Sequence, residues 1–309
     1  MTENNALLAA IKKSKGYKPV SSGQFIGERL RYPSKRNVTW FNGYQNIDIK
    51  PQRVLTRADY DFKFAVAPVT IAETEKALNE GANQVYSLYG QRIEEALSNI
   101  ENTIDEGLYS DGMGFAGLQI DGLQQFVSIT PASGVVGGID ASIEDNAWWR
   151  NQFATAALTE DNISRELNKL WLTMMRSKDM PNLLVSDAEH FNLYWGTLEE
   201  RRRFGPAEMT SGGTKGVMFN SAVMVMGSGT GMHAPTKRTY FLNTKYLCYR
   251  PHRRYNIKPL PPVRSINQVA TVTLVMFGGN MTCSNRNLQG VLVGTQPCLL
   301  YTSPSPRDS

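Results

Sequence analysis

The chain has 309 residues, of which 41% are hydrophobic and 20% charged, and its formal net charge is +5. These values are typical of a globular protein with a sizeable core and exclude a disordered chain, while the charge falls short of a dedicated nucleic-acid-binding domain. No apolar run approaches the roughly 20 residues of a membrane helix, and no signal-peptide segment is present, so we expect a soluble, cytoplasmically made protein without a membrane partner.

The first 69 residues divide into two predicted segments. Residues 1–24 are polar and carry several lysines, which predicts a flexible N-terminal arm. Residues 25–69 alternate strand-like pieces with turn signals and have few core-forming residues for their length, but many arginines and lysines. We expect an extended, basic hairpin that finds its partner on another chain, and a solvated loop is the alternative interpretation.

Residues 73–112 are predicted to form one unbroken helix, because apolar residues recur every three or four positions. About 37 residues at about 1.5 Å each would make a rod of about 55 Å, longer than a compact domain needs. Thr70 and Glu73 have the spacing of a capping box. The spacing does not keep strict heptads, which favours a strut on a sheet over a coiled coil. The predicted core face comprises Leu78, Val85, Tyr89, Ile93, Leu97, Ile100 and Ile104.

The second half of the chain predicts an α+β fold in which strands outnumber helices. Residues 159–176 have the spacing of an amphipathic helix, residues 182–186 read as a strand, and residues 187–204 read as a second helix. Three strand-rich stretches follow, over residues 216–227, 238–250 and 267–279. A glycine-rich connector that contains Trp148 and Trp149 precedes the first of these helices.

The sequence offers no persuasive active site, and we expect neither an enzyme nor a cofactor or metal. Asp187, Glu189 and His190 stand together, but Ser186 and Glu189 have capping-box spacing, which favours a structural role. The glycines of residues 227–231 lack the features of a phosphate-binding loop and predict a turn between strands. The three cysteines have no metal-ligand spacing and are predicted to be free buried thiols.

Residues 298–309, "CLLYTSPSPRDS", differ in character from the strand-like stretch before them. The string resembles one reading frame of a common sequencing adapter. We therefore interpret this segment as a read-through artefact and exclude it from the predicted fold.

Several segments together resemble one family of known proteins. They are "TWFNGYQNIDIKP", "LTRADYDFKFAVAPVTI", "GGIDAS", "NAWWRN", "YFLNTKYLCYRPHRRYNIKPL" and "GNMTCSNRNLQGVL". In this order they resemble segments of the major capsid proteins of tailed bacteriophages, which have the Hong Kong 97-like fold. No single motif is decisive, and the resemblance covers nearly all of residues 25–293.

This resemblance implies a division of the chain. Residues 1–24 would be the N-terminal arm and residues 25–69 the extended loop with its lead-in strand. Residues 70–116, with the spine helix, and the return strands 240–279 would form the peripheral domain. Residues 117–239 and 280–297 would form the axial domain. The loop would lie across the adjacent subunit, where we expect contacts from Arg29, Arg31, Lys35, Arg36, Trp40, Phe41 and Tyr44.

The resemblance also implies a structural function. The chain would assemble with itself into pentameric and hexameric capsomers, in an icosahedral shell around packaged double-stranded DNA that it contacts non-specifically. We expect a separate scaffolding protein, a portal, assembly in the host cytoplasm and a final location in the virion capsid. An encapsulin-like compartment shell is the alternative, and a nucleic-acid-binding module is a third hypothesis that leaves the long helix unexplained.

Overall fold

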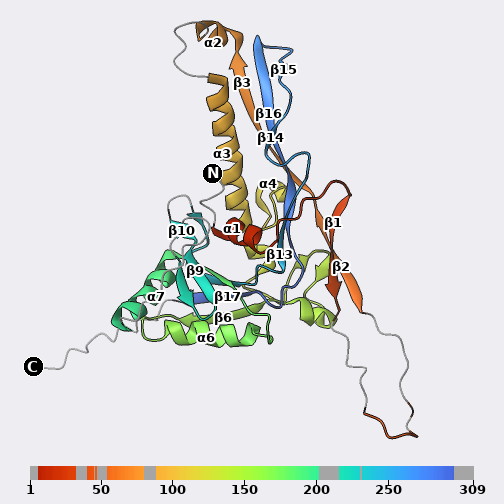
Figure 1. Ribbon diagram of the computed structural model, residues 1–309, viewed down its shortest axis with the longest axis vertical. Helices are drawn as coiled ribbons and strands as arrows, with labels where there is room; N and C mark the ends of the chain where they lie inside the picture. Colours follow the sequence, from red (N-terminus) through yellow and green to blue (C-terminus); the bar gives the residue numbers. More distant parts are fainter. Residues whose placement is uncertain are drawn as a thin grey trace, which may run out of the picture.

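The computed structural model describes residues 6–32, 40–44, 46, 54–79, 88–201, 216–229 and 232–295. The described part has an elongated lobe, in which a long helix lies beside a sheet, and a compact lobe with a second sheet and two helices (Figure 1). A two-stranded sheet, formed by residues 25–31 and 55–61, lies beside them. The predicted α+β class is confirmed.

Strand β16 (Ala270–Cys283) is the centre of the elongated lobe. It pairs antiparallel with β3 (Lys63–Ala72) along the whole length of β3, from Gly279 opposite Lys63 to Ala270 opposite Ala72. Three short strands complete this five-stranded sheet: β13 (Leu247–Pro251), β14 (Lys258–Pro259) and β15 (Val263–Arg264). Helix α3 (Leu88–Tyr109) packs against β3 and β16, so the predicted strut on a sheet is present.

The prediction of one unbroken helix is wrong. Helix α2 (Glu73–Leu78) ends at Asn79, which leaves the helical conformation with φ −109° and ψ 21°. Residues 80–87 lie outside the described residues, and α3 begins at Leu88. Asn79, Gly81 and Asn83 are all poor helix formers, so the sequence carried a signal for a break. The predicted capping box is also wrong, because Thr70 belongs to strand β3 and Ala72 is the residue before α2.

The predicted core face of the helix holds only within α3. Ile100 and Ile104 are buried, and Ile93 and Leu97 pack against the same hydrophobic cluster while remaining half-buried. Tyr89, in the first turn of α3, is 41% exposed and departs from this face, although its hydroxyl lies 3.1 Å from Thr273 Oγ1.

Leu78 does not belong to this face, since 89% of it is exposed. Because α2 is a separate helix, its rotation about its own axis is not fixed by the apolar stripe of α3. Val85 lies outside the described residues.

Two glycines fit the end of α3 to the chain that follows. A Cβ atom on Gly107 would lie 2.6 Å from Ile120 Cγ1, so only glycine allows this close approach. Gly112 has φ +76°, in the left-handed region that favours glycine. The chain can therefore turn back sharply against the helix it has just left.

The compact lobe is built on a six-stranded sheet with the order β6-β17-β12-β7-β9-β8. The strands are β6 (Gln152–Ala157), β7 (Leu183–Ser186), β8 (Val217–Phe219), β9 (Ala222–Met226), β12 (Arg238–Leu242) and β17 (Gly290–Thr295). Helices α6 (Ile163–Met174) and α7 (Ala188–Arg201) pack on it with a hydrophobic cluster that includes Leu184, Phe241 and Leu292. The alternate residues Val185, Tyr240 and Val291 belong to the other cluster, so both faces of the sheet are buried.

The prediction of a flexible N-terminal arm is wrong for the described residues 6–24. Helix α1 (Ala6–Lys13) buries Leu7 and Ile11 completely, because positions four residues apart lie on one face of a helix. Beyond it, Tyr17 and Val20 form isolated bridges with Tyr249 and His252. The N-terminal segment is therefore part of the subunit's own core.

Short elements complete the connections. They are α4 (Gly114–Gly117), α5 (Leu123–Phe126), β4 (Val135–Val136), β5 (Ile139–Asp140), a 3-10 helix (Glu144–Trp149), β10 (Ser228–Gly229) and β11 (Met232–His233). Trp149 anchors the connector before β6, since its ring is buried and its Nε1 donates to the carbonyl of Val136 at 3.0 Å. Strands β10 and β11 pair as a short hairpin where a turn between strands was predicted.

Candidate inter-subunit surfaces

A hairpin stem forms the first candidate surface. Strand β1 (Phe25–Arg31) pairs antiparallel with β2 (Leu55–Asp61), and both lie beside the two lobes in Figure 1. Along β1, Ile26, Glu28 and Leu30 are buried, while Arg29 and Arg31 are exposed. The predicted shortage of core-forming residues is therefore wrong for the strands. The alternation in "FIGERLR" was the signal, because side chains two apart share a face of a strand.

Glu28 fixes the register of this stem. Its carboxylate Oε1 accepts hydrogen bonds from Arg250 Nε and Thr282 Oγ1, both at 2.8 Å, and also pairs with Arg250 Nη2. A shift of β1 by one residue would expose the apolar side chains and bury Arg29 instead. The stem thus belongs to the subunit's own fold and holds the exposed arginines in fixed positions, a role of Glu28 that sequence reasoning missed.

Aromatic side chains lie exposed in the segment that connects β1 to β2. Trp40 is 95% and Tyr44 104% exposed, and Phe41 is also exposed. Large apolar side chains gathered on a surface mark interaction sites more often than chance. Lys35 and Arg36, predicted to contact the neighbouring chain, lie outside the described residues.

The face of the elongated sheet away from α3 forms a second candidate surface. Val69 and Ile71 of β3 point to the buried side, and the alternate residues Phe64 and Val66 are exposed. On β16, Leu274 is partly exposed and lies opposite Pro68 of β3. An apolar stripe therefore runs along the uncovered face of the sheet.

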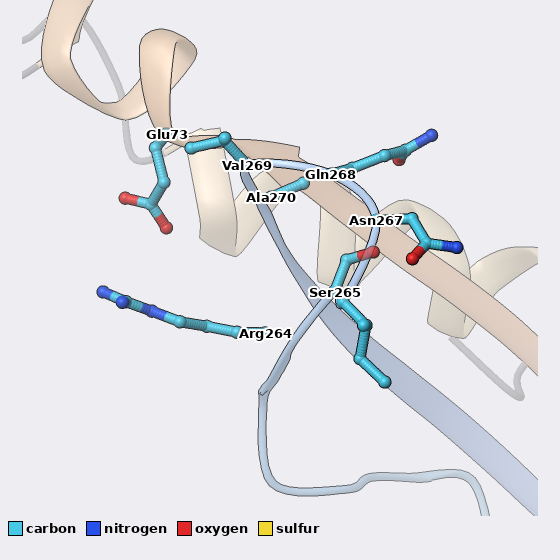
Figure 2. Close-up of a pocket in the computed structure, with 8 residues that line it drawn as sticks. Glu73, Arg264, Ser265, Asn267, Gln268, Val269 and Ala270 are labelled. Atoms are coloured by element: carbon cyan, nitrogen blue, oxygen red, sulfur yellow. The ribbon is translucent and has the colours of Figure 1, made fainter.

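The far end of the elongated lobe is a third candidate surface. The turn of residues 265–269 joins β15 to β16 and lines a pocket of about 530 Å³ together with Arg264 and Glu73, whose charged ends lie on the same side of the view (Figure 2). The Glu73 carboxylate accepts hydrogen bonds from Lys76 Nζ and Thr271 Oγ1, both at 2.9 Å, and the bond from Lys76 lowers the pKa of Glu73. Ile266 in this turn is 99% exposed.

The cluster around His190 is structural. His190 is buried, its Nδ1 lies 2.9 Å from Thr239 Oγ1, and burial lowers its pKa, so the ring stays neutral. Asp187 Oδ1 accepts the backbone N–H of His190 at 3.0 Å and caps α7. The predicted capping box of Ser186 and Glu189 is wrong, because Ser186 ends strand β7 and Asp187 performs this role. The hydroxyl that contacts the ring belongs to Thr239, whose side chain is completely buried.

The two cysteines of the described residues are buried thiols. Cys248 and Cys283 are free and buried, and burial raises the pKa of Cys283 to about 12. A thiol with so high a pKa carries almost no thiolate at neutral pH. Cys298 lies outside the described residues.

Within the described ranges, no group of three or more histidine, cysteine, aspartate or glutamate side chains is placed to hold a metal ion. A search of the same residues for a helix that is long and apolar enough to cross a membrane finds none.

No family model matches the chain, and no curated protein matches it by sequence. Solved structures do match. A chain of the cyanophage A-1(L) capsid asymmetric unit is 13% identical, with a TM-score of 0.65 and 90% of each chain covered. A chain of Mycobacterium phage Bobi is 12% identical, with a TM-score of 0.58 and coverage of 95% of this chain and 91% of that one.

A third match comes from a cellular protein. A chain of the holo-SrpI encapsulin complex from Synechococcus elongatus PCC 7942 is 9% identical, with a TM-score of 0.57 and coverage of 91% of this chain and 85% of that one. These identities are low, but the matches extend over nearly the whole length of both partners. The chain therefore has the fold of tailed-phage major capsid proteins, which the encapsulin shares.

Proposed function

We propose that this chain is the major capsid protein of a tailed bacteriophage, a structural subunit that assembles with itself into an icosahedral shell. The observation that carries this proposal is the match in fold over about nine-tenths of this chain and of the cyanophage capsid chain. The exposed aromatic and arginine side chains of the hairpin and the apolar stripe on the β3–β16 sheet support it. A subunit of a closed shell must bury surface against several copies of itself.

In this proposal the elongated lobe is the peripheral domain and forms the wall of the shell. It comprises residues 70–116, with α3 as the spine, the return strands within 240–279 and the lead-in strand β3 that pairs with them. Residues 117–239 and 280–297 form the axial domain around the symmetry axis of each capsomer, and α1 packs on strand β13 of the peripheral domain in its own subunit. The burial of α3 against β3 and β16 gives the wall a rigid rod.

Within residues 25–69, the hairpin of β1 and β2 would be the extended loop, which reaches across the adjacent subunit, and β3 would be the lead-in strand. Its stem is tied to its own subunit through Glu28, while Arg29 and Arg31 face outward. The exposed rings of Trp40, Phe41 and Tyr44 would lose their solvent exposure on the neighbour. Lys35 and Arg36 would add charge to the same contact. Apolar burial would supply affinity, and the cations would set orientation and register.

The shell would consist of pentameric and hexameric capsomers and would enclose double-stranded DNA without reading its sequence. A separate scaffolding protein and a portal would be partners during assembly in the host cytoplasm, and the final location would be the virion capsid. No cofactor or catalytic step enters this role, which needs only the folded subunit and its contacts.

An encapsulin-like compartment shell is the second candidate, favoured by the match to the encapsulin complex. Both candidates require closed particles, but they differ in content. Particles purified from their natural source should hold nuclease-protected DNA if the chain is a phage capsid protein. A co-purifying cargo enzyme without DNA would favour the compartment, and a chain that stays monomeric would contradict both.

A further inference from the structure

The sequence contains one Asn-Gly pair, Asn42–Gly43, in the segment that connects β1 to β2. The backbone N–H of Tyr44 donates to the carbonyl oxygen of Asn42, which closes a three-residue turn with Gly43 at its centre. Asn42 and Gly43 are both exposed. Because glycine has no Cβ atom, nothing on this residue keeps its backbone nitrogen away from the asparagine side chain before it.

The two groups that could react with each other are unrestrained. Within the part of the chain that the structure describes, neither the side-chain amide of Asn42 nor the N–H of Gly43 makes a hydrogen bond. A Cβ atom added to Gly43 would meet nothing within 4 Å. The Gly43 nitrogen can therefore approach the Asn42 side-chain carbon Cγ, and water reaches both atoms.

Two Asp-Gly pairs of the chain have the same spacing of reacting groups, but the fold restrains them. In Asp111–Gly112, the N–H of Gly112 donates to Ser110 Oγ at 3.1 Å. In Asp121–Gly122, the aspartate is 8% exposed, and its carboxylate accepts a hydrogen bond from Asn280 Nδ2 at 2.9 Å. Of the three pairs, only the Asn-Gly pair combines exposure with unrestrained reacting groups.

We propose that Asn42–Gly43 is a site of spontaneous deamidation. Hydroxide removes the proton of the Gly43 N–H, and the nitrogen attacks Asn42 Cγ, so that a new N–Cγ bond closes a succinimide ring. The Cγ–Nδ2 bond breaks, and Nδ2 takes up a proton from water and leaves as ammonia. Water then opens the ring at either carbonyl. Cleavage of the new N–Cγ bond leaves aspartate, whereas cleavage of the original peptide bond leaves isoaspartate. The net reaction is hydrolysis of one amide, without oxidation or reduction.

The reaction would change the surface that the hairpin presents. It adds a carboxylate beside the exposed rings of Phe41 and Tyr44, and isoaspartate also lengthens the main chain by one carbon atom. The consequence for assembly rests on the proposed function: a new charge in the contact would weaken it, and a neighbouring subunit that covers Asn42 would protect it from water. Deamidation would then be confined to unassembled subunits and would limit how long they stay competent to assemble.

The test is peptide mass spectrometry of the full chain after incubation at neutral and at mildly alkaline pH. Asn42 should gain about 1 Da, because oxygen replaces an NH group. The rate should rise in proportion to the hydroxide concentration. Asn46 is exposed in the same segment but is followed by isoleucine, so it is a matched internal control and should keep its mass. An isoaspartate-specific methyltransferase should label position 42, but neither Asp111 nor Asp121.

Gly43→Val provides the matched variant. It should slow the gain in mass by about 10-fold or more, because a β-branched side chain crowds the backbone nitrogen. The melting temperature should not change, since the space around Gly43 is open. The proposal is overturned if Asn42 keeps its mass at alkaline pH, if Asn46 reacts as fast as Asn42, or if Gly43→Val reacts as fast as the unaltered chain. A gain in mass without isoaspartate would also overturn it, because only the ring yields both products.

A separate arm tests the protection by assembly. Particles and unassembled subunits are separated by size and incubated side by side. Slower deamidation in the particles is the expected result, and equal rates would overturn the protection while the modification itself stands. Failure of Asn42 to react in free subunits would overturn the modification but not the capsid proposal, which is tested by the formation of particles.

Discussion

Asp105, on α3, shows how burial acts on a single ionisable side chain of the spine. Desolvation raises the pKa of its carboxyl group from 3.8 to about 6, and attraction to His233 opposes this only in part. Burial disfavours the charged form because water no longer stabilises the carboxylate. At neutral pH the folded chain therefore carries a charge that would be better solvated in the unfolded chain.

The sign of the resulting pH dependence is fixed by this shift. Because the folded-state pKa is raised, the penalty from this group begins near pH 3.8, grows as the pH rises and is complete above about pH 6, so its contribution becomes more favourable as the pH falls from 7 to 5. Asp105→Asn removes the charge, so it should raise the melting temperature at pH 7.5 by more than it does at pH 5. Glu106→Gln, at the exposed neighbouring position, should show no such difference. An equal effect of Asp105→Asn at both pH values would contradict this account.

At the scale of elements, local patterns predicted some segments well. β16, β7 and α6 lie where apolar runs or helical spacing placed them, because each satisfies a rule that involves near neighbours in sequence. A hairpin was predicted, but the burial of its stem in the subunit's own core was missed although the alternation was visible, since Glu28 takes one of the inward positions. A buried carboxylate is acceptable there only because Arg250, far away in sequence, reaches it.

The different burial of three helix positions predicts a graded loss of stability for three substitutions. Ile104→Asp should destabilise the subunit by about 3–5 kcal/mol, because an unpartnered carboxylate would replace a buried side chain. Leu97→Asp, at a half-buried position, should cost about 2 kcal/mol, and Leu78→Asp, at an exposed one, should change stability by less than about 0.5 kcal/mol. Chemical denaturation of the three variants gives the order. A large loss from Leu78→Asp would show that α2 packs its apolar side inward.

Charge reversal on the hairpin separates folding from assembly. Replacing Arg29, Arg31, Lys35 and Arg36 with glutamate should leave the circular dichroism spectrum unchanged, because exposed charges contribute little to the stability of a subunit. The same change should oppose association by several kcal/mol over repeated contacts, so the protein should sediment as monomers or loose capsomers. Glutamates at Arg253 and Arg254 provide a control with exposed charges outside the stem. Closed particles from the hairpin variant would refute this role, and unfolding would show that the exposed basic side chains themselves stabilise the subunit.

At the scale of the whole molecule, the order of elements carried more information than any single motif. The resemblance to phage capsid proteins implied a fold that the structural matches confirm over nine-tenths of the chain. One pocket is lined by Arg29, Trp148, Arg176 and Asn287, and it could not be predicted because these residues meet only through tertiary contacts. The outward direction of Arg29 and Arg31 was readable from strand alternation, but their place beside a pocket was not.

The most direct test of the capsid proposal is electron cryomicroscopy of the purified, expressed protein. We predict closed icosahedral particles in which copies form pentamers and hexamers, with the lobe of α3, β3 and β16 in the wall. The hairpin of each copy should lie across the next copy. Monomers under all conditions of salt and concentration, or aggregates without icosahedral symmetry, would contradict the proposal.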